Sequence, residues 1–207
     1  QRFNNRIINF VKIKCLIEKK PRDTYGALYI LKKKIKNNFF LANGDTFFDI
    51  NFNEFAKNKL SNQLINVVLV KNKSYRKNSK LNNLTIGKNH YLKSNSKSKL
   101  MNAGFYFIKK KLIKKIKNKK ISLENEIMPN LIKQKKVKGF FSDRFFIDIG
   151  TPESLKKSKK LIPNHFYKPA AFFDRDGVIN HDFGYTHKIK NFKFKRGVLK
   201  ALRFLTK

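Results

Sequence analysis

The sequence predicts an α/β fold: a mixed sheet with helices on its faces, followed by one further strand–helix unit. Short apolar runs alternate with helix-like runs through roughly the first 160 residues, which favours a mixed or parallel sheet. An apolar run at 170–173 then ends in two aspartates and a glycine, and chemistry in open α/β sheets sits beyond such strand ends. The amphipathic stretch 198–205 indicates the helix that follows this strand.

Strands and helices alternate from the start of the chain. Apolar residues indicate a short strand over 13–17, and the segment that opens at Gly26 is predicted as a helix to about residue 36. The aromatic run 39–42 is predicted as a buried strand and 52–59 as a helix. The apolar, valine-rich run 64–70 is the strongest strand signal, whereas the polar segment 75–99 contains only a weak hairpin over 84–86 and 90–92.

The same alternation continues to residue 160. Strands are predicted over 105–108, 137–141 and 145–147, with helices over 110–117 and 124–133. Thr151 can cap a helix over 152–160, because its hydroxyl can accept a hydrogen bond from the free amides of the first turn.

The end of this pattern sets the domain organisation. We predict one domain over 1–162, a linker over 163–169 and the start of a second domain over 170–207, since Pro163 and Pro169 flank a segment without a helical pattern. One strand and one helix cannot bury a core of their own. We therefore expect the chain to be a piece of a longer protein.

The composition excludes several classes of protein. The formal net charge is +36, but the charge is nearly all Lys spread along the chain, and Lys, Asn, Ile and Phe share AT-rich codons, so we expect no nucleic-acid partner. A hydrophobic content of 41% suffices for a globular core. The single Cys15 excludes a disulfide framework, and the sequence has neither a membrane-spanning run nor a signal peptide. We expect a cytoplasmic enzyme that does not bind membranes.

Asp174 and Asp176 follow the predicted strand at 170–173, and Gly177 lets the backbone turn away. Two aspartates at this spacing can divide phosphoryl transfer, because the first can attack phosphorus while the second gives and takes the proton. Mg²⁺ would let an anionic nucleophile approach an anionic phosphate, so both aspartates are also candidate metal ligands. The pattern resembles the first motif of the haloacid dehalogenase (HAD) superfamily of phosphatases.

The segment after this motif makes the resemblance more specific. Residues 180–188 and 191–194 look like the D-glycero-D-manno-heptose 1,7-bisphosphate 7-phosphatase branch of that superfamily. The resemblance implies that Gly184, Tyr185 and His187 contact the substrate. It also implies that zinc can bind a Cys/His cluster in a later part of the phosphatase domain, which these residues do not include. The Ser/Thr and Lys that hold the phosphate in this family, and the distal aspartates of its metal site, are also missing from these residues. We therefore expect residues 1–207 alone to show no phosphatase activity.

A second carboxylate pair lies in the first domain. Asp45 follows the predicted strand 39–42 with Gly44 before it, and Asp148 follows the strand 145–147 with Gly150 after it. If the two aspartates converge, they form a hard oxygen site of the kind that Mg²⁺ takes when it bridges nucleotide phosphates, and both glycines would allow close backbone approach.

These segments, with 102–104 and 122–126 between them in order, resemble the sugar-1-phosphate nucleotidyltransferases, and within them the mannose- or heptose-1-phosphate guanylyltransferases. The resemblance implies a Rossmann-like (GT-A-like) domain followed by the first strand–helix unit of a HAD-like domain. It also implies a role for individual residues. Asp45 and Asp148 would hold the metal, whereas Asn102, Gly104, Glu124 and Lys93 would contact the sugar phosphate. The nucleotide would be bound by Thr24, Gly26, Gly44 and Asp45.

Two segments depart from the family pattern. Arg22-Asp23 stands where Leu-Gly is usual, and 1–10 does not match the Gly-rich loop that grips the triphosphate. We expect that loop to precede Gln1.

Together these features predict a bifunctional enzyme of nucleotide-activated heptose synthesis. One half would hydrolyse the 7-phosphate of heptose 1,7-bisphosphate, and the other would join the sugar 1-phosphate to a nucleoside triphosphate, preferably GTP. One alternative keeps the transferase but makes it specific for mannose or another hexose 1-phosphate, with a HAD phosphatase of other specificity. A different class of protein is a basic, non-catalytic binding module.

Overall fold

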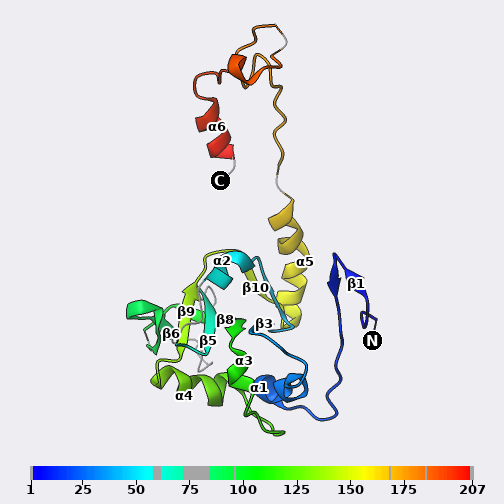
Figure 1. The fold of residues 1–207 in the computed structure, drawn as a ribbon, viewed down its shortest axis with the longest axis vertical. Coiled ribbons are helices and arrows are strands. Elements are labelled where there is room, and N and C mark those ends of the chain that lie inside the picture. The colour runs from blue at the N-terminus through cyan, green and yellow to red at the C-terminus, as the bar shows by residue number, and fades with distance from the viewer. Residues whose placement is uncertain are drawn as a thin grey trace. The chain divides into compact units, whose positions relative to one another are not determined.

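A computed structural model describes residues 2–57, 62–71, 84–95, 97–167, 169–184 and 186–205. The chain divides into two compact units, Gln1–Lys160 and Leu161–Lys207 (Figure 1). The first unit contains a mixed sheet with helices, as the sequence predicts, and the second contains the motif around Asp174.

The main sheet of the first unit has the strand order β7-β6-β8-β5-β9, and β3 also pairs with β8. Its strands are β3 (Phe39–Ala42), β5 (Ile65–Lys71), β6 (Leu84–Ile86), β7 (Leu92–Ser94), β8 (Leu100–Ile108) and β9 (Val137–Phe141). The strands β5 and β9 run parallel, and the other pairs are antiparallel. The predicted mixed sheet is therefore confirmed, with β8 at its centre.

Side chains that alternate along β5 face two separate parts of the core. Val67 and Leu69 belong to a cluster with residues of α1 (Asp23–Ala27), α3 (Lys110–Ile113) and α4 (Met128–Lys133). Val68 and Val70 belong to a second cluster, which contains Phe55 of α2 (Phe52–Lys57). Successive side chains of a strand point to opposite faces, so β5 is covered on both faces, which explains its unbroken apolar sequence.

Two short two-stranded ribbons accompany the main sheet. β4 (Thr46–Phe48) pairs with β10 (Phe146–Asp148), and β1 (Ile7–Ile8) pairs with β2 (Val11–Lys12), both in the antiparallel sense. Short helical turns complete the unit: η1 (Leu28–Leu31), η2 (Lys88–His90) and η3 (Leu123–Ile127). The predicted strand over 13–17 is wrong, because the hairpin β1–β2 lies just before it and 13–17 has no strand partner among the described residues.

Two predicted helices have different lengths in the structure. The helix predicted over 110–117 ends at Ile113, because closely spaced lysines repel one another and the chain turns so that Ile116 joins the core. The helix predicted over 152–160 continues as α5 (Pro152–Phe166) and includes Pro163. The first residues of the predicted linker are therefore helical.

The second unit contains α6 (Val198–Leu205), as predicted, and the turn η4 (Ile189–Asn191). The strand predicted over 170–173 is wrong: this segment is irregular, and Phe172 is 96% exposed. A buried strand needs neighbours to satisfy its backbone groups, and no described strand pairs with it. The aspartates are instead held by a loop in which Asn180 bridges to Asp176 and to Phe194.

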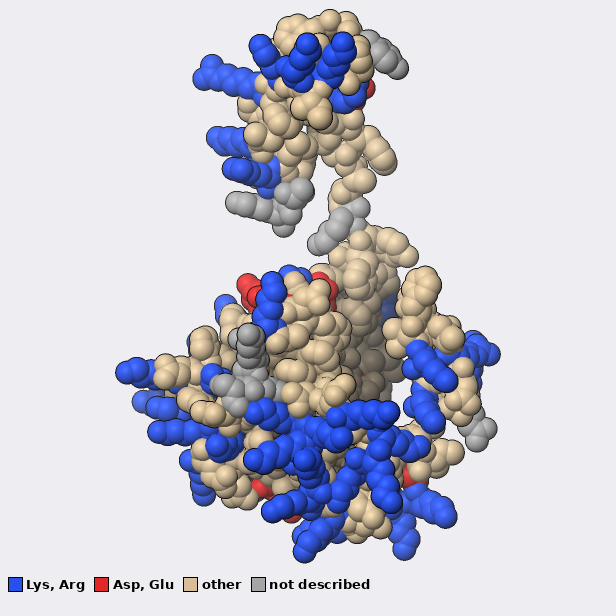
Figure 2. All heavy atoms as spheres, viewed as in Figure 1, with Lys and Arg blue, Asp and Glu red and all other residues tan. Residues whose placement is uncertain are grey.

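Positive side chains cover much of the visible face of the first unit, most densely over α1, α3 and α4 (Figure 2). Of the lysines in and around α3, Lys111, Lys114 and Lys115 are exposed. Within the described ranges, no helix is both long and apolar enough to cross a bilayer.

Candidate active site

Asp45 and Asp148 are brought together by the ribbon β4–β10. Asp148 ends β10 opposite Thr46, the residue after Asp45. The backbone amide of Ile149 then donates a hydrogen bond to the carbonyl of Asp45 at 2.8 Å. Because the ribbon fixes this register, the two aspartates are close neighbours although they lie far apart in the sequence.

Gly150 lies at the point where the two carboxylates meet. Its amide donates to Asp148 Oδ1 at 2.7 Å. A Cβ atom at Gly150 would lie 2.9 Å from Asp45 Oδ2 and 3.1 Å from Asp148 Oδ1, so a side chain there would crowd both. Of the two glycines predicted to allow close approach, Gly150 is therefore closely packed, whereas a Cβ atom at Gly44 would meet nothing within 4 Å. Both carboxylates are exposed to solvent.

An open cavity of about 840 Å³ lies beside this pair. Three of the predicted nucleotide-binding residues line it: Thr24, Gly44 and Asp45. Gly26, the fourth, does not line it and packs instead against the backbone of 119–121, where its amide donates to the Ile121 carbonyl at 3.0 Å. Gly26 therefore positions the helix α1 that carries Thr24.

Two of the residues predicted to contact the sugar, Asn102 and Gly104, lie on an irregular part of β8. Val67 of β5 is opposite Tyr106 and Leu69 is opposite Asn102, so Ala103, Gly104 and Phe105 face Val68 alone. Gly104 takes a positive φ of 71° within this bulge. Bulges commonly re-aim side chains next to sites. The sequence shows the Asn-Ala-Gly motif but not that it bends the central strand.

A chain of hydrogen bonds joins Asn102 to Glu124 through Tyr106. Asn102 Nδ2 donates to the Tyr106 hydroxyl at 2.7 Å, and that hydroxyl donates to Glu124 Oε1 at 2.8 Å. The Gly104 amide donates to Asn102 Oδ1 at 2.9 Å. Three predicted sugar-contacting residues therefore form one network. Tyr106 was not predicted as a site residue, because in the sequence it is one of several apolar residues of a strand.

Gly104 also contacts the loop that leads to Asp45. The Asn43 amide donates to the Gly104 carbonyl at 2.9 Å, and a Cβ atom at Gly104 would lie 2.5 Å from Asn43 Nδ2. Asn43 lines the cavity together with Gly44 and Asp45. The predicted sugar-contacting residues (the sugar half-site) and the predicted nucleotide-binding residues (the nucleotide half-site) are thus adjacent at Gly104.

Replacing Gly104 by Ala is expected to lower the free energy of unfolding by about 1–3 kcal/mol, because the residue has a positive φ and no room for a methyl group. Chemical denaturation measures this change. Gly44→Ala is the matched control, since a Cβ atom there meets nothing within 4 Å. Equal stability of the two variants would contradict the close packing at Gly104.

Lys93 is not brought to this network. It lies on β7, opposite Thr85 of β6, and a Cβ atom at Gly87 would meet its Cε atom at 2.9 Å. β6 separates β7 from β8 in the sheet. The predicted contact between Lys93 and the sugar phosphate is therefore not supported by the geometry.

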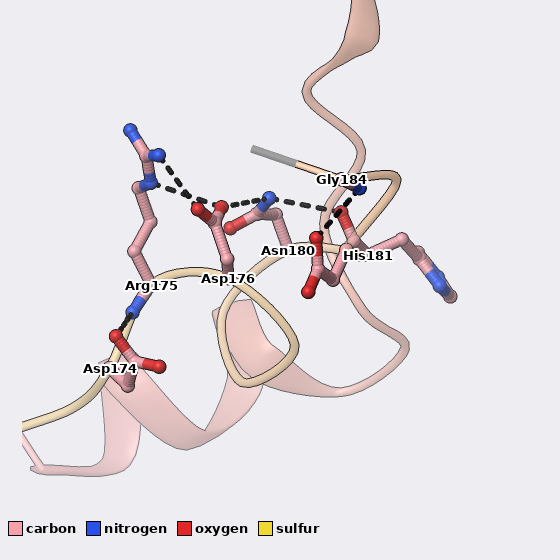
Figure 3. A network of polar contacts seen from close by, with 7 residues as sticks. Asp174, Arg175, Asp176, Asn180, His181 and Gly184 are labelled. Atoms are coloured by element: carbon pink, nitrogen blue, oxygen red, sulfur yellow. Dashed lines mark hydrogen bonds and ion pairs between the residues drawn. The ribbon is translucent and has the colours of Figure 1, made fainter. Parts of the chain in front are cut away.

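In the second unit, Arg175 contacts both predicted catalytic aspartates (Figure 3). Its backbone amide donates to Asp174 Oδ1 at 2.8 Å. Its guanidinium donates from Nε to Asp176 Oδ1 at 3.1 Å and from Nη2 to Asp176 Oδ2 at 2.8 Å. Asn180 Nδ2 also donates to Asp176 Oδ1 at 2.9 Å. The hydrogen bonds from Arg175 and then Asn180 hold the pKa of Asp176 below its usual value.

The predicted substrate contacts of this unit lie on the following loop. Gly184 has a φ of 78°, and its amide donates to Asp182 Oδ1 at 2.9 Å (Figure 3). His187 is exposed, and Tyr185 lies outside the described residues. Within the described part of the chain, no group of three or more His, Cys, Asp or Glu residues could hold a metal ion.

Comparisons with known proteins divide at the same place as the sequence motifs. The family model for nucleotidyl transferases matches residues 1–165. A D-glycero-alpha-D-manno-heptose 1-phosphate guanylyltransferase of Campylobacter jejuni is 34% identical over 148 residues, which covers 69% of this chain and 64% of that protein. A D-glycero-beta-D-manno-heptose-1,7-bisphosphate 7-phosphatase of Haemophilus influenzae is 60% identical over 38 residues, which covers 18% of this chain and 21% of that protein. The chain thus spans less than two thirds of either relative.

Solved structures agree with the fold of the first unit. HddC from Yersinia pseudotuberculosis matches with a TM-score of 0.62 and 25% identity, over 74% of this chain and 69% of that chain. The same protein complexed with GMP-PN matches with a TM-score of 0.60. Because the family model covers most of the sequence, including both aspartates of the ribbon and the network on β8, the chain belongs to the nucleotidyl transferase family.

Proposed function

We propose that the first unit transfers a nucleotidyl group from GTP to a heptose 1-phosphate. The observation that carries this proposal is the convergence of Asp148 with Asp45, which lines a cavity together with Thr24 and Gly44. The guanylyltransferase from Campylobacter jejuni and the GMP-PN complex of HddC favour guanine and heptose as the substrate groups.

The proposed reaction is a displacement at phosphorus. A phosphate oxygen of the sugar 1-phosphate attacks the α-phosphorus of GTP, the bond to the β-phosphate oxygen breaks, and pyrophosphate leaves. Asn102 and Glu124 would orient the sugar for this attack, because an amide and a carboxylate can together bond neighbouring hydroxyls.

Asp45 and Asp148 would hold the Mg²⁺ that this chemistry requires. Mg²⁺ is usually bound through one or two carboxylates together with substrate phosphates and water, so a carboxylate pair open to solvent fits it. When bound, Mg²⁺ neutralises charge on the triphosphate and the leaving pyrophosphate.

For the second unit we propose hydrolysis of the 7-phosphate of heptose 1,7-bisphosphate. The short match to the Haemophilus phosphatase and the pair Asp174 and Asp176 support it. Asp174 would attack phosphorus and Asp176 would transfer the proton. Arg175 donates two hydrogen bonds to Asp176 and so favours its carboxylate form, which is the form that accepts a proton. Heptose 1-phosphate, the product, would then be the substrate of the first unit, and joining the units raises its local concentration.

An assay of pyrophosphate release from the full-length protein tests the transferase proposal. We expect GTP with heptose 1-phosphate to react faster than ATP, CTP or UTP, and faster than GTP with mannose 1-phosphate. A preference for mannose 1-phosphate would favour the alternative hexose specificity. No pyrophosphate from any pair of substrates would contradict nucleotidyl transfer.

The basic face over α1, α3 and α4 favours a second candidate, a non-catalytic module that binds polyanions (Figure 2). Affinity for nucleic acid at low salt is expected from the net charge alone. We expect this binding to disappear at moderate salt, because it depends on counterion release. Sequence-selective binding that survives at moderate salt would favour the module over the enzyme.

A further inference from the structure

The Tyr106 hydroxyl is the one group that touches both Asn102 and Glu124 in the network on β8 as the structure describes it. We propose that Tyr106 is a positioning residue of the sugar half-site, which holds Asn102 and Glu124 in the orientation that a sugar 1-phosphate needs. The proposal rests on the transferase function proposed above and adds to it a residue that touches neither reacting atom.

The direction of each hydrogen bond in this network follows from the chemistry of its members. A carboxylate only accepts, so the Tyr106 hydroxyl must donate the hydrogen bond to Glu124. Its oxygen then accepts from Asn102 Nδ2, and this fixes Asn102 Oδ1 toward the Gly104 amide. Only a side chain that both donates and accepts a hydrogen bond can stand between Asn102 and Glu124. Phenylalanine, which has the same ring, cannot.

The residue at the centre of the network is buried, whereas the two residues that it contacts are not. Tyr106 is 1% exposed, whereas Asn102 and Glu124 are each partly exposed. The tyrosine therefore lies beneath the surface and supports two residues that can reach a ligand. Burial first, then the charge of Glu124, raise the pKa of Tyr106 well above its usual value, so the hydroxyl keeps its proton throughout the neutral range.

Glu124 retains bonding capacity for a ligand. Its Oε1 atom accepts from Tyr106, and its Oε2 atom lies 3.4 Å from the Ser122 hydroxyl, the long limit of a hydrogen bond. Ser122 also caps η3, since its Oγ accepts from the Asn125 amide at 3.0 Å. The carboxylate is thus held on one side and can accept sugar hydroxyls with Oε2.

The network reaches the loop that carries the predicted nucleotide-binding residues, but it includes none of them. Gly104 connects Asn102 to Asn43, next to Gly44 and Asp45. A defect at Tyr106 should therefore weaken sugar binding much more than nucleotide binding. This difference distinguishes a positioning role from a general contribution to stability.

The test compares Tyr106→Phe with Tyr25→Phe in the full-length protein. Tyr25 is a suitable control because it is 6% exposed and its hydroxyl donates to the Leu112 carbonyl at 2.7 Å, so its loss removes a similar hydrogen bond away from Glu124. Calorimetric titration measures the binding of heptose 1-phosphate and, separately, of a non-hydrolysable GTP analogue, and thermal denaturation measures stability.

We expect Tyr106→Phe to weaken heptose 1-phosphate binding about 10- to 100-fold, the range for losing a hydrogen bond to a charged group. Its affinity for the GTP analogue should stay within about twofold, and Tyr25→Phe should leave both affinities unchanged. In the assay, KM for the sugar phosphate should rise more than kcat falls.

Two results would overturn the inference in different ways. If the unmodified protein binds heptose 1-phosphate and Tyr106→Phe binds it equally well, the positioning role is wrong and the proposed function stands. If the unmodified protein binds no sugar 1-phosphate, both fall.

A spectroscopic measurement reports on the network without any ligand. Ultraviolet absorbance follows tyrosine ionisation, and the difference between the unmodified protein and Tyr106→Phe isolates Tyr106. Glu124→Gln should lower the pKa of Tyr106 because it removes a neighbouring negative charge, and Asn102→Ala should raise it. No change in either variant would contradict the hydrogen-bonded chain.

Discussion

Replacing Asp148 by Asn is expected to reduce nucleotidyl transfer by the full-length protein about 100- to 1,000-fold in kcat/KM, the size of effect seen when a group that stabilises transition-state charge is lost. The amide keeps the shape of the side chain but removes half of the negative charge that Asp45 and Asp148 offer to Mg²⁺ around Gly150. Pyrophosphate release at several Mg²⁺ concentrations measures the effect, and we expect high Mg²⁺ to restore part of the activity.

The matched control is Asp143→Asn, which removes the same charge from an exposed position between β9 and β10. Its activity and melting temperature should equal those of the unmodified protein. Full activity of Asp148→Asn at low Mg²⁺ would show that this carboxylate is not a metal ligand.

Replacing Asp176 by Asn is expected to reduce phosphate release from heptose 1,7-bisphosphate about 100- to 10,000-fold, the usual contribution of a general acid–base group. The one oxygen of asparagine can still accept from Arg175 Nε and from Asn180, whereas the hydrogen bond from Arg175 Nη2 to Oδ2 is lost. The measurement is phosphate release by the full-length protein, with nucleotidyl transfer from supplied heptose 1-phosphate assayed on the same sample.

The two substitutions serve as controls for each other. Asp176→Asn should leave nucleotidyl transfer nearly intact, and Asp148→Asn should leave phosphate release nearly intact, because their residues lie in separate compact units. If either variant remained folded and lost both activities, the assignment of two separate sites would be wrong.

Short apolar and aromatic runs in the sequence predicted several strands of the main sheet. The strands at 39–42 and 137–141 have their predicted bounds, since aromatic and β-branched residues favour strands. The prediction that 39–42 is buried is wrong, because Phe40 is 40% exposed. The segments at 13–17 and 170–173 have the same local character but are irregular. Neither segment has a neighbouring strand among the described residues, and pairing is a property of the whole fold that a short run of residues cannot show.

The sequence predicted several residues of the site but not the hydrogen bonds that join them. The order of the motifs brought Asp45, Asp148, Asn102 and Glu124 forward as candidates, and the structure places them in a pair and a network. Tyr106 was missed because a tyrosine within an apolar strand looks like ordinary core. Lys93 was chosen because it could match the family lysine that meets the sugar phosphate, and in a chain with a net charge of +36 few lysines can be told apart by such a match.

The ribbon β4–β10 also has a consequence for folding. The two carboxylates that it joins are about a hundred residues apart in the chain, and contacts of such long range form late because the intervening loop must first be closed. Nascent or partly folded chains would therefore have no assembled carboxylate pair. Divalent cations that bind the pair would stabilise only the folded unit, so Mg²⁺ should raise its melting temperature as well as support catalysis.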